Sequence, residues 1–470
     1  MVIGIITTFL VCLAMFFPFS NSVPLSNFTI QNFGVIHVPY KSGNYTIYQI
    51  NGVNYIKDSV GNVLYSSASA NSIFSFAFST VKSGGYVLVL NGTFLANGQS
   101  IRMRNCQGVT LEFNSGALLT ISDNANVPVF TVENCQDCII KGIKIDGNGA
   151  KQNNPFWFAN GIDLYQCSNV TVINAYIINC QTYGFITHAD GPKPNGIINS
   201  TILNSGMNGI TLGSSYESVT IGAYAINNTI AYGTGDVGIS VYGSYCHVIG
   251  NTIHDLTRNG VNTDACWGIA VEQHNTQTTG WNIITDNIIY NCSVGIVLGE
   301  HGTRIRENLV ARNIIKNCAP YGIVSSGLGY NTITNNTIIN EFSTYQGTQI
   351  HAAILLGFYT PATVQTSNDT VVNNTIICNL TNRYVEGAIV SHQTKYSKIT
   401  NNNVTTNINS GVVGIKLESY TNLTLVQQNK VQATTGIYIG TTCYYNRLVQ
   451  NILTGCSTLI VDRGIGTIYE

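Results

Sequence analysis

Charged side chains are scarce in this 470-residue chain. Asp, Glu, Lys and Arg make up 9% of the residues, and the formal net charge is −1. An average soluble domain is about one quarter charged. Lys and Arg form no basic run in the sequence, so nucleic acid is not an expected partner, because binding to phosphates needs a basic surface. The surface must instead be built from Asn, Ser, Thr, Tyr and Gly, which can hydrogen-bond to sugars.

Long apolar runs are also lacking, except at the start of the chain. Residues 1–17 are apolar apart from two threonines, and small and polar residues follow. This length fits a signal peptide better than a membrane span. We predict a signal peptide over residues 1–22, a secreted or cell-surface protein, and no stable membrane insertion after the signal is removed. The missing basic flank leaves an uncleaved anchor as the alternative.

Helical periodicity is absent after residue 82, which argues against globin-like and Rossmann folds. A repeated module is present instead. Gly followed by Ile, or a close equivalent, recurs 22 to 35 residues apart, which is the size of one coil of a β-solenoid. These steps are Gly161, Gly184, Gly209, Gly238, Gly268, Gly295, Gly322, Gly414 and Gly436, with Ala353 and Ala388 in two further places.

A second strand with an Asn lies between successive Gly–Ile steps. Because stacked Asn side chains can hydrogen-bond from one coil to the next, these residues are expected to form a ladder. Its expected members are Asn199, Asn228, Asn251, Asn287, Asn313, Asn336, Asn374, Asn402, Asn429 and Asn451.

The segment before the repeats has a different pattern. Residues 25–66 are polar and rich in Tyr, and residues 67–81 carry apolar side chains at helical spacing. Gly84-Gly85 ends this helix, and residues 86–94 read as a strand. Residues 139–145 read as a strand that precedes Asp-Gly-Asn-Gly. We therefore divide the chain into a lead-in and capping segment, residues 23–82, and a repeat domain, residues 83–470.

This entrance resembles the pectate-lyase-like superfamily, which has the pectin lyase fold. Its members commonly begin with a capping helix, a Gly-Gly turn and a strand like that of residues 86–94. The resemblance implies an all-β fold, a single right-handed parallel β-helix with a short N-terminal capping helix.

The cysteines and the sequons point to the same repeat. Twelve of the 13 cysteines follow the predicted signal peptide, and several occupy equivalent places in successive modules. Neighbouring parallel strands are close enough for disulfides. We therefore expect either stacked core thiols or disulfides between coils, with Cys292–Cys318 as the favoured pair.

Sequons such as those at Asn227, Asn335 and Asn373 are glycosylation candidates in a secreted protein, although the Asn-Asn-Thr-Ile module also creates them by accident.

Residues 254–306 form the predicted site region. Placing Gly268 over Gly295 brings two acids and two imidazoles together, and sugar rings commonly pack on aromatic side chains beside acids. The predicted catalytic residues are Glu272, His274, Glu300 and His301. The predicted substrate-binding residues are His188, Tyr242, Asp264, Trp267, Trp281 and Arg304.

Two reactions suit these side chains. Hydrolysis of a glycosidic bond needs two carboxylates, which Glu272 with Glu300 or Asp264 supply. Lysis or C5 epimerisation of a uronate needs a base, a proton donor and a cation. His274 or His301, Tyr242 and Arg304 fit those three roles.

Short stretches also resemble two enzyme families of this fold. Asn262-Thr263-Asp264, Glu300-His301-Gly302 and Arg304-Ile305-Arg306 are similar to polygalacturonase motifs, but the paired aspartates of that family are absent. The segment from Tyr183 to His188 is similar to a motif of alginate C5-epimerases, with Ile186 where that family has its catalytic aspartate.

The sequence thus predicts a protein that engages polysaccharide. It acts either as a lyase, epimerase or glycoside hydrolase, or as a non-catalytic structural or adhesive protein at the cell surface. Several lyases of the superfamily use Ca²⁺, which makes calcium the candidate cofactor, although no acidic cluster in the sequence has the density of a calcium cage. The sequence identifies neither a metal ligand nor an oligomeric state.

Overall fold

The computed structural model describes residues 43–470, apart from several internal segments. The chain divides into two compact units, residues 1–40 and 41–470, and all described residues belong to the second. The segments left out are 154–157, 189–190, 214–219, 234, 257–265, 274–277, 300–303, 341–350, 358–365, 379–384 and 408–410. Outside the described residues therefore lie the predicted signal peptide and four predicted site residues, Asp264, His274, Glu300 and His301.

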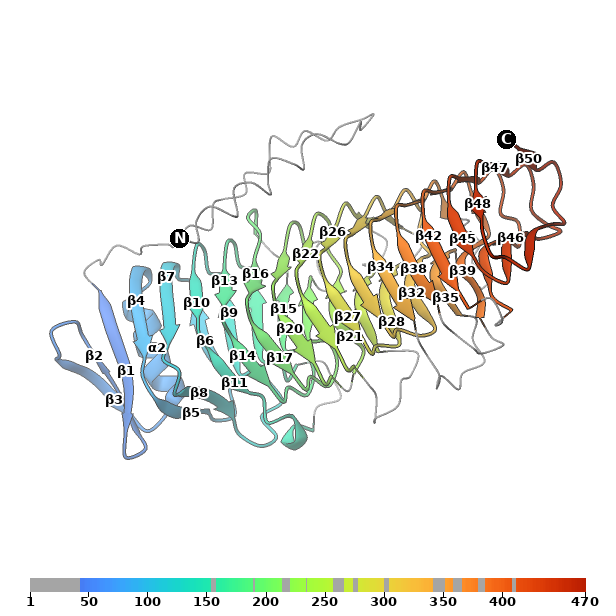
Figure 1. Ribbon diagram of the computed structural model, residues 1–470. Coiled ribbons are helices and arrows are strands. Elements are labelled where there is room, and N and C mark those ends of the chain that lie inside the picture. Colours follow the sequence, from blue (N-terminus) through green and yellow to red (C-terminus); the bar gives the residue numbers. More distant parts are fainter. Residues whose placement is uncertain are drawn as a thin grey trace, which may run out of the picture. The chain divides into compact units, whose positions relative to one another are not determined.

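The second unit is a β-solenoid in which each coil contributes one strand to each of three sheets, named A, B and C (Figure 1). Sheet A has 18 strands: β1 (Asn44–Ile50), β2 (Val53–Lys57), β3 (Val63–Ser67), β4 (Ser83–Val89), β7 (Gln107–Phe113), β10 (Ile139–Lys141), β13 (Thr171–Ile173), β16 (Gly196–Ile198), β19 (Tyr224–Ile226), β22 (His247–Ile249), β26 (Ile283–Thr285), β30 (Leu309–Ala311), β33 (Thr332–Thr334), β37 (Thr370–Val372), β41 (Lys398–Thr400), β44 (Leu425–Gln427), β47 (Arg447–Val449) and β50 (Ile468–Tyr469).

Sheet B has 14 strands: β5 (Gly92–Ala96), β8 (Ala117–Ile121), β11 (Lys144–Asp146), β14 (Tyr176–Ile178), β17 (Thr201–Leu203), β20 (Thr229–Ala231), β23 (Thr252–His254), β27 (Ile288–Tyr290), β31 (Ile314–Lys316), β34 (Thr337–Asn340), β38 (Thr375–Cys378), β42 (Asn403–Thr406), β45 (Lys430–Gln432) and β48 (Ile452–Leu453).

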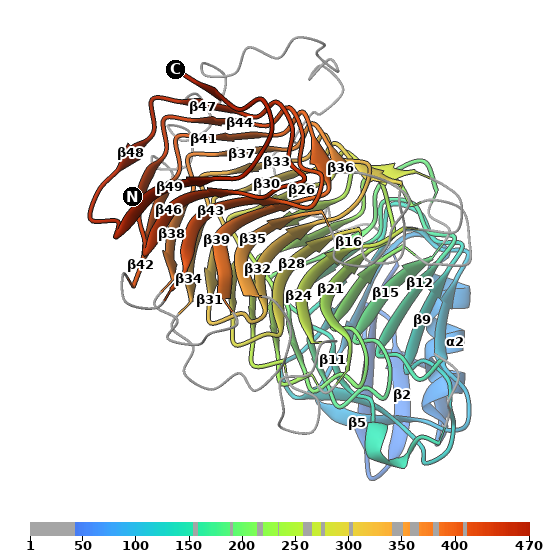
Figure 2. The ribbon, with the colours of Figure 1, turned by 90° about the vertical axis from the view of Figure 1, so that its right-hand side faces the viewer.

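Sheet C also has 14 strands: β6 (Ile101–Arg104), β9 (Phe130–Glu133), β12 (Ile162–Tyr165), β15 (Phe185–His188), β18 (Ile210–Leu212), β21 (Val237–Val241), β24 (Trp267–Val271), β28 (Val294–Leu298), β32 (Tyr321–Ser325), β35 (His351–Leu356), β39 (Val385–His392), β43 (Val413–Glu418), β46 (Thr435–Ile439) and β49 (Thr458–Asp462). Figure 2 shows the strands of this sheet side by side. Two short parallel pairs lie between sheets C and A, β25 (Thr279–Gly280) with β29 (Ile305–Arg306) and β36 (Thr366–Ser367) with β40 (Thr394–Lys395).

The N-terminal end confirms the predicted capping helix. Helix α2 (Ala70–Thr80) is capped at its N-terminus by Ser69, whose side chain accepts a hydrogen bond from the backbone N–H of Ser72. The Phe74 ring lies 5.6 Å from the Phe94 ring, centroid to centroid, so the helix packs on the first coil. Strands β1, β2 and β3 pair antiparallel, and β1 joins the solenoid by pairing parallel with β4. A short 3-10 turn, η3 (Gly149–Lys151), interrupts a later coil.

Two predicted strands are wrong in their extent, because each bends at a corner. Residues 86–94 divide between β4 and β5, and residues 139–145 divide between β10 and β11. Gly142 turns the second corner with φ +70°, and a Cβ there would lie 2.8 Å from the Phe113 carbonyl oxygen. The strands of sheet A, the third strand of each coil, were not predicted from the module.

The Gly–Ile step has a packing cause. A Cβ added to Gly268 would lie 2.5 Å from Ile289 Cγ2 and 2.6 Å from the Gly295 carbonyl oxygen. Such contacts exclude larger side chains. The predicted register is confirmed, since Ile269 pairs with Ile296 and Val271 pairs with Leu298.

The predicted Asn ladder is confirmed, with one correction. Asn251 accepts hydrogen bonds from the backbone N–H and the side chain of Asn228, and Asn287 does the same for Asn251. Asn199 is exposed and outside the ladder, and Ser200 takes its place by donating its backbone N–H to Asn228. The ladder continues through Asn313, Asn336, Asn374, Asn402, Asn429 and Asn451.

The cysteines are stacked core thiols. All 12 that follow the predicted signal peptide are free, and all except Cys456 are buried. The predicted Cys292–Cys318 disulfide is therefore wrong. Burial and the neighbouring Cys318 raise the pKa of the Cys292 thiol.

The sequon residues Asn227, Asn335 and Asn373 lie exposed at corners where the backbone is in the left-handed region.

Candidate functional site

The outer face of sheet C changes character along the solenoid. One outward position can be followed by register through successive strands from β12 to β43. It is occupied by Asp163, Ile186, Thr211, Ser240, Ala270, Val297, Val324, Leu355, Val390 and Lys416. The same backbone position is thus mostly polar in the early coils and apolar in the central coils.

We call the early part the polar stretch, which comprises Asp163, Tyr165, Tyr183, His188, Tyr242 and Glu272 together with Ser240. The central part, the apolar stretch, is a buried cluster on the outer face of the sheet. It comprises Val237, Trp267, Ala270, Val294, Val297, Val324, Ala352, Leu355 and Val390. The two stretches meet at β21 and β24.

Glu272 is the central group of the polar stretch. It follows β24 and is only 3% exposed. Tyr242 Oη donates to one carboxylate oxygen at 2.7 Å, and Ser240 Oγ donates to the other. Both donors come from the neighbouring coil, so these hydrogen bonds tie two coils together. Burial, then the Glu272 charge, raises the pKa of the Tyr242 phenol well above its usual range, and Tyr242 therefore stays protonated at neutral pH.

A second polar pair lies earlier on the same face. His188 Nε2 lies 3.3 Å from Asp163 Oδ1, and the two side chains are 20% and 14% exposed. Tyr165 is next to His188 in register, with ring centroids 6.2 Å apart. His188 and Glu272 are three coils apart in register, which is about 14 Å at about 4.8 Å per coil. The pair and the buried carboxylate are thus neighbouring but separate groups.

The two tryptophans predicted to bind substrate lie at different places. Trp267 begins β24, about 16 Å along the strand from Glu272, and it is buried within the apolar stretch. Trp281 lies at the corner before β26, where its ring stacks on Tyr245 and its Nε1 donates to Glu307. The two residues are apart because the chain turns a corner between them.

Of the other predicted residues, Arg304 is exposed beside β29, where its backbone N–H donates to Gln273 Oε1 at 3.1 Å. His188 and Tyr242 lie on the outer face of sheet C. Sequence reasoning did not assign a role to Ser240 or Tyr183. The alternation of inward and outward side chains along a strand was the available signal, but it identified no hydrogen-bond partner for either residue.

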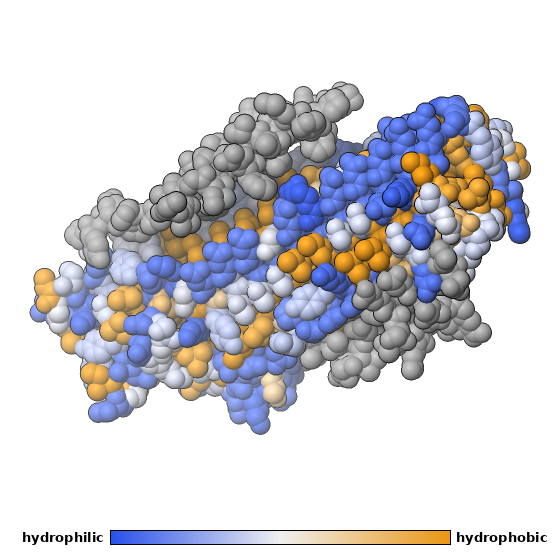
Figure 3. All heavy atoms as spheres, viewed as in Figure 1, coloured by the Kyte–Doolittle hydropathy of each residue, from blue (hydrophilic) through white to orange (hydrophobic). Residues whose placement is uncertain are grey.

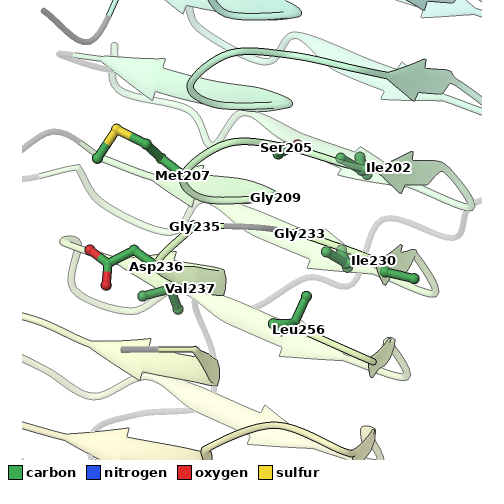
Figure 4. A pocket seen from close by; sticks show the side chains of 11 residues that line it. Ile202, Ser205, Met207, Gly209, Ile230, Gly233, Gly235, Asp236, Val237 and Leu256 are labelled. Carbon is green, nitrogen blue, oxygen red and sulfur yellow. The ribbon is translucent and has the colours of Figure 1, made fainter. Parts of the chain in front are cut away.

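The described interior has no room for a ligand. A cavity lined by Ile202, Ile230 and Leu256, among others, holds about 10 Å³ (Figure 4), which is roughly the room for one water molecule. An open hollow of about 560 Å³ lies beside η3, bordered by Asp146, Asn148 and Asn179. Within the described residues, no three His, Cys, Asp or Glu side chains are grouped as metal ligands would be. In the same part of the chain, no helix combines the length and apolarity needed to cross a membrane.

Comparison with known proteins agrees with this architecture. A model of the right-handed β-helix region family matches residues 160–338. The chain has the right-handed parallel β-helix fold. The predicted resemblance to the pectate-lyase-like superfamily is thereby confirmed at the level of fold. No curated protein matches the chain in sequence.

Solved β-helix structures cover most of the chain. A mutant tailspike protein of Escherichia coli bacteriophage HK620, in complex with a hexasaccharide, is 12% identical with a TM-score of 0.53, covering 88% of this chain and 78% of that one. The same tailspike with a pentasaccharide is 13% identical with a TM-score of 0.50, covering 85% and 77%. The A-module of a mannuronan C-5 epimerase of Azotobacter vinelandii is 15% identical with a TM-score of 0.40, covering 86% and 94%. Identities this low establish the fold alone.

Proposed function

We propose that this β-helix binds a polysaccharide along the polar stretch of sheet C. The observation that carries the proposal is the buried Glu272 carboxylate, held by Tyr242 and Ser240 across two coils. A buried carboxylate is costly unless it is well hydrogen-bonded, and such groups concentrate at functional sites. Packing alone requires no charge here, because the next two coils carry the uncharged residues Gly299 and Ser326 at the corresponding position.

The residues around Glu272 suit a sugar. Tyr165, Tyr183 and Tyr242 are partly exposed on one face, and the apolar faces of pyranose rings pack well on aromatic side chains. Asp163 and His188 add acceptors and donors for hydroxyl groups. The HK620 tailspike, which shares the fold, was solved with a bound hexasaccharide. Secretion through a signal peptide over residues 1–22 belongs to the same proposal, since extracellular glycans would then be the substrate.

Catalysis on the bound glycan is the second candidate. The Asp163–His188 contact favours it, because a carboxylate beside an imidazole can orient the ring and stabilise its protonated form. In that case His188 transfers a proton, and Tyr242 Oη, whose own proton is donated to Glu272, accepts a hydrogen bond from a sugar hydroxyl. Without turnover, the same surface serves an adhesive or structural protein.

The test is binding to a panel of pectate, alginate, glycosaminoglycan and neutral oligosaccharides, with and without Ca²⁺. Tyr242→Ala and Glu272→Gln are each expected to weaken binding of the recognised glycan at least tenfold, or about 1.4 kcal/mol. Tyr420→Ala is the matched control, since Tyr420 is an exposed tyrosine outside the polar stretch. Equal affinities for wild type and both variants would refute the proposed site.

Turnover is measured on the same panel by reducing-end release and by the ultraviolet absorbance of unsaturated uronate. Activity that is lost in His188→Gln while binding remains would establish catalysis. Epimerisation, which releases no ends, is followed by NMR of the C5 proton. Binding without product in any assay would establish the adhesive function.

A further inference from the structure

A row of exposed aromatic side chains follows the corner between sheets C and A. Backbone pairing aligns Gly280 with Arg306 and Arg306 with Gly329, and farther along it aligns Ser367, Lys395, Asn422 and Tyr444. The residue after each of these positions is at the corner. In order, with Tyr245 before them, the corner residues are Tyr245, Trp281, Glu307, Tyr330, Asn368, Tyr396, Leu423 and Tyr445.

These corner residues share one backbone conformation. Each has a positive φ, from 53° to 60°, which side chains other than Gly, Asn and Asp adopt infrequently. Tyrosine has no conformational advantage at such a corner, and Asn is the residue that fits it best. The chain itself uses Asn in this row, at Asn368. The repeated aromatic side chains therefore call for a reason other than the turn.

The rings are exposed where the row is most regular. Tyr330, Tyr396 and Tyr445 are 53%, 54% and 59% exposed. At the start of the row, the Tyr245 and Trp281 rings stack with centroids 5.2 Å apart and planes 8° apart, which shows that one coil separates neighbouring side chains by about one strand spacing. Large apolar groups aligned on a surface mark an interaction site more often than scattered ones do.

The aromatic residues recur every second coil. Trp281, Tyr330, Tyr396 and Tyr445 alternate with Glu307, Asn368 and Leu423, so successive rings are about 9.6 Å apart at about 4.8 Å per coil. This spacing matches the length of roughly one disaccharide in an extended β-1,4-linked chain. The exposed rings of Tyr330, Tyr396 and Tyr445 would then each meet every second sugar, whereas the Trp281 ring already contacts Tyr245 and Arg306.

The charges beside the row favour a neutral ligand. Arg306 lies over the Trp281 ring at 5.0 Å and pairs with Glu307 at 3.5 Å. Arg447 pairs with Glu470 at 2.6 Å. These two ion pairs neutralise an arginine near each end of the row, and Lys395 lies next to Tyr396 in the middle. Recognition of an acidic polymer would need several unpaired cations along the row.

We propose that this corner row is a second carbohydrate-binding surface, which holds an extended, neutral β-1,4-linked glycan parallel to the solenoid axis. It is separate from the polar stretch of sheet C and does not depend on the function proposed there. A regular row of rings spaced by the fold suits the flat surface of an insoluble polymer, in which many chains present the same repeat.

The experiment measures partition of the purified full chain onto insoluble cellulose and chitin, with starch granules as the α-linked comparison. The chain is produced in a host without N-glycosylation, since some replacements complete a sequon. Wild type is expected to bind cellulose or chitin and not starch. The triple variant Tyr330→Asn, Tyr396→Asn and Tyr445→Asn is expected to bind at least tenfold less, because Asn keeps the corner conformation and removes the rings.

Tyr232→Asn is the matched control, because Tyr232 is 58% exposed and has φ 57° but lies at a different corner, after β20. It is expected to bind as wild type does. Tyr396→Phe keeps the ring and should retain binding. Undiminished binding by the triple variant, or no binding of wild type to either β-linked polymer, would overturn the proposal. So would sedimentation showing that the row instead joins two copies of the chain.

Discussion

The polar and apolar stretches of sheet C use one backbone for two purposes. Ser240 and Leu355 occupy the same outward register position, and both are fully buried. Ser240 donates a hydrogen bond to the Glu272 carboxylate, whereas Leu355 packs against other apolar side chains. One backbone geometry therefore accommodates both a hydrogen-bonded carboxylate and an apolar cluster. The outward side chains differ, and they change within a few coils.

The largest effect on stability is expected from shortening a side chain of the apolar stretch. Leu355→Ala should lower the free energy of unfolding by about 2–5 kcal/mol, because it removes buried apolar contacts and leaves a cavity. Urea-induced unfolding measures this. The counterpart in the polar coils is Thr211→Val, which keeps the side-chain volume and removes one hydrogen bond from Asn208. Its cost should be about 0.5–1.5 kcal/mol. Equal costs for the two variants would contradict the distinction between the stretches.

A buried carboxylate in the interior sharpens the comparison with Glu272. Asp369 follows Asn308 and Asn331 in a second, buried ladder, separate from that of Asn251. It accepts hydrogen bonds from the Asn331 backbone N–H at 2.8 Å and from Ser325 Oγ at 2.9 Å. Desolvation raises its pKa to about 7 from the usual 3.8. Between about pH 4 and 7 the folded state therefore holds a proton that the unfolded chain releases, so stability falls as pH rises through this window.

Asp369→Asn should remove this pH dependence. The gain above pH 7 is expected to reach up to about 4 kcal/mol, since each pKa unit corresponds to about 1.36 kcal/mol. Unfolding midpoints at pH 4, 6 and 8 for wild type and the variant check it. Below about pH 4 the two proteins should be alike. A variant that is no more stable than wild type at pH 8 would contradict the raised pKa of the Asp369 carboxyl.

Most of the fold could be predicted from the sequence, because packing inside a coil restricts the residue types strictly. Gly268 has no room for a Cβ, and Asn251 must both donate and accept between coils. Such positions repeat visibly. The strands of sheet A after β10 were missed, although Asn282 and Asn308 precede two of them and form a second ladder with Asn331. The Cys292–Cys318 pairing was wrong because buried thiols and disulfides leave the same pattern in the sequence.

The candidate site was predicted less well. Glu272 and Tyr242 were both named as site residues, but their hydrogen bond joins residues 30 positions apart, and only the register reveals it. Trp267 and Trp281 are close in sequence and were assigned to one site, although a corner separates them. The aromatic row was missed for a related reason, since its members are spread over 200 residues and align only when every coil is counted correctly.

Figure 3 shows hydrophilic and hydrophobic residues side by side on one face of the molecule, so composition of the surface does not locate the glycan. The most direct test is hydroxyl-radical footprinting with and without the glycan that binds best. The proposed site predicts that Tyr165, His188 and Tyr242 become protected, while Tyr65 and Tyr420 remain reactive. Unchanged reactivity of all three residues at saturating glycan would contradict binding at the polar stretch.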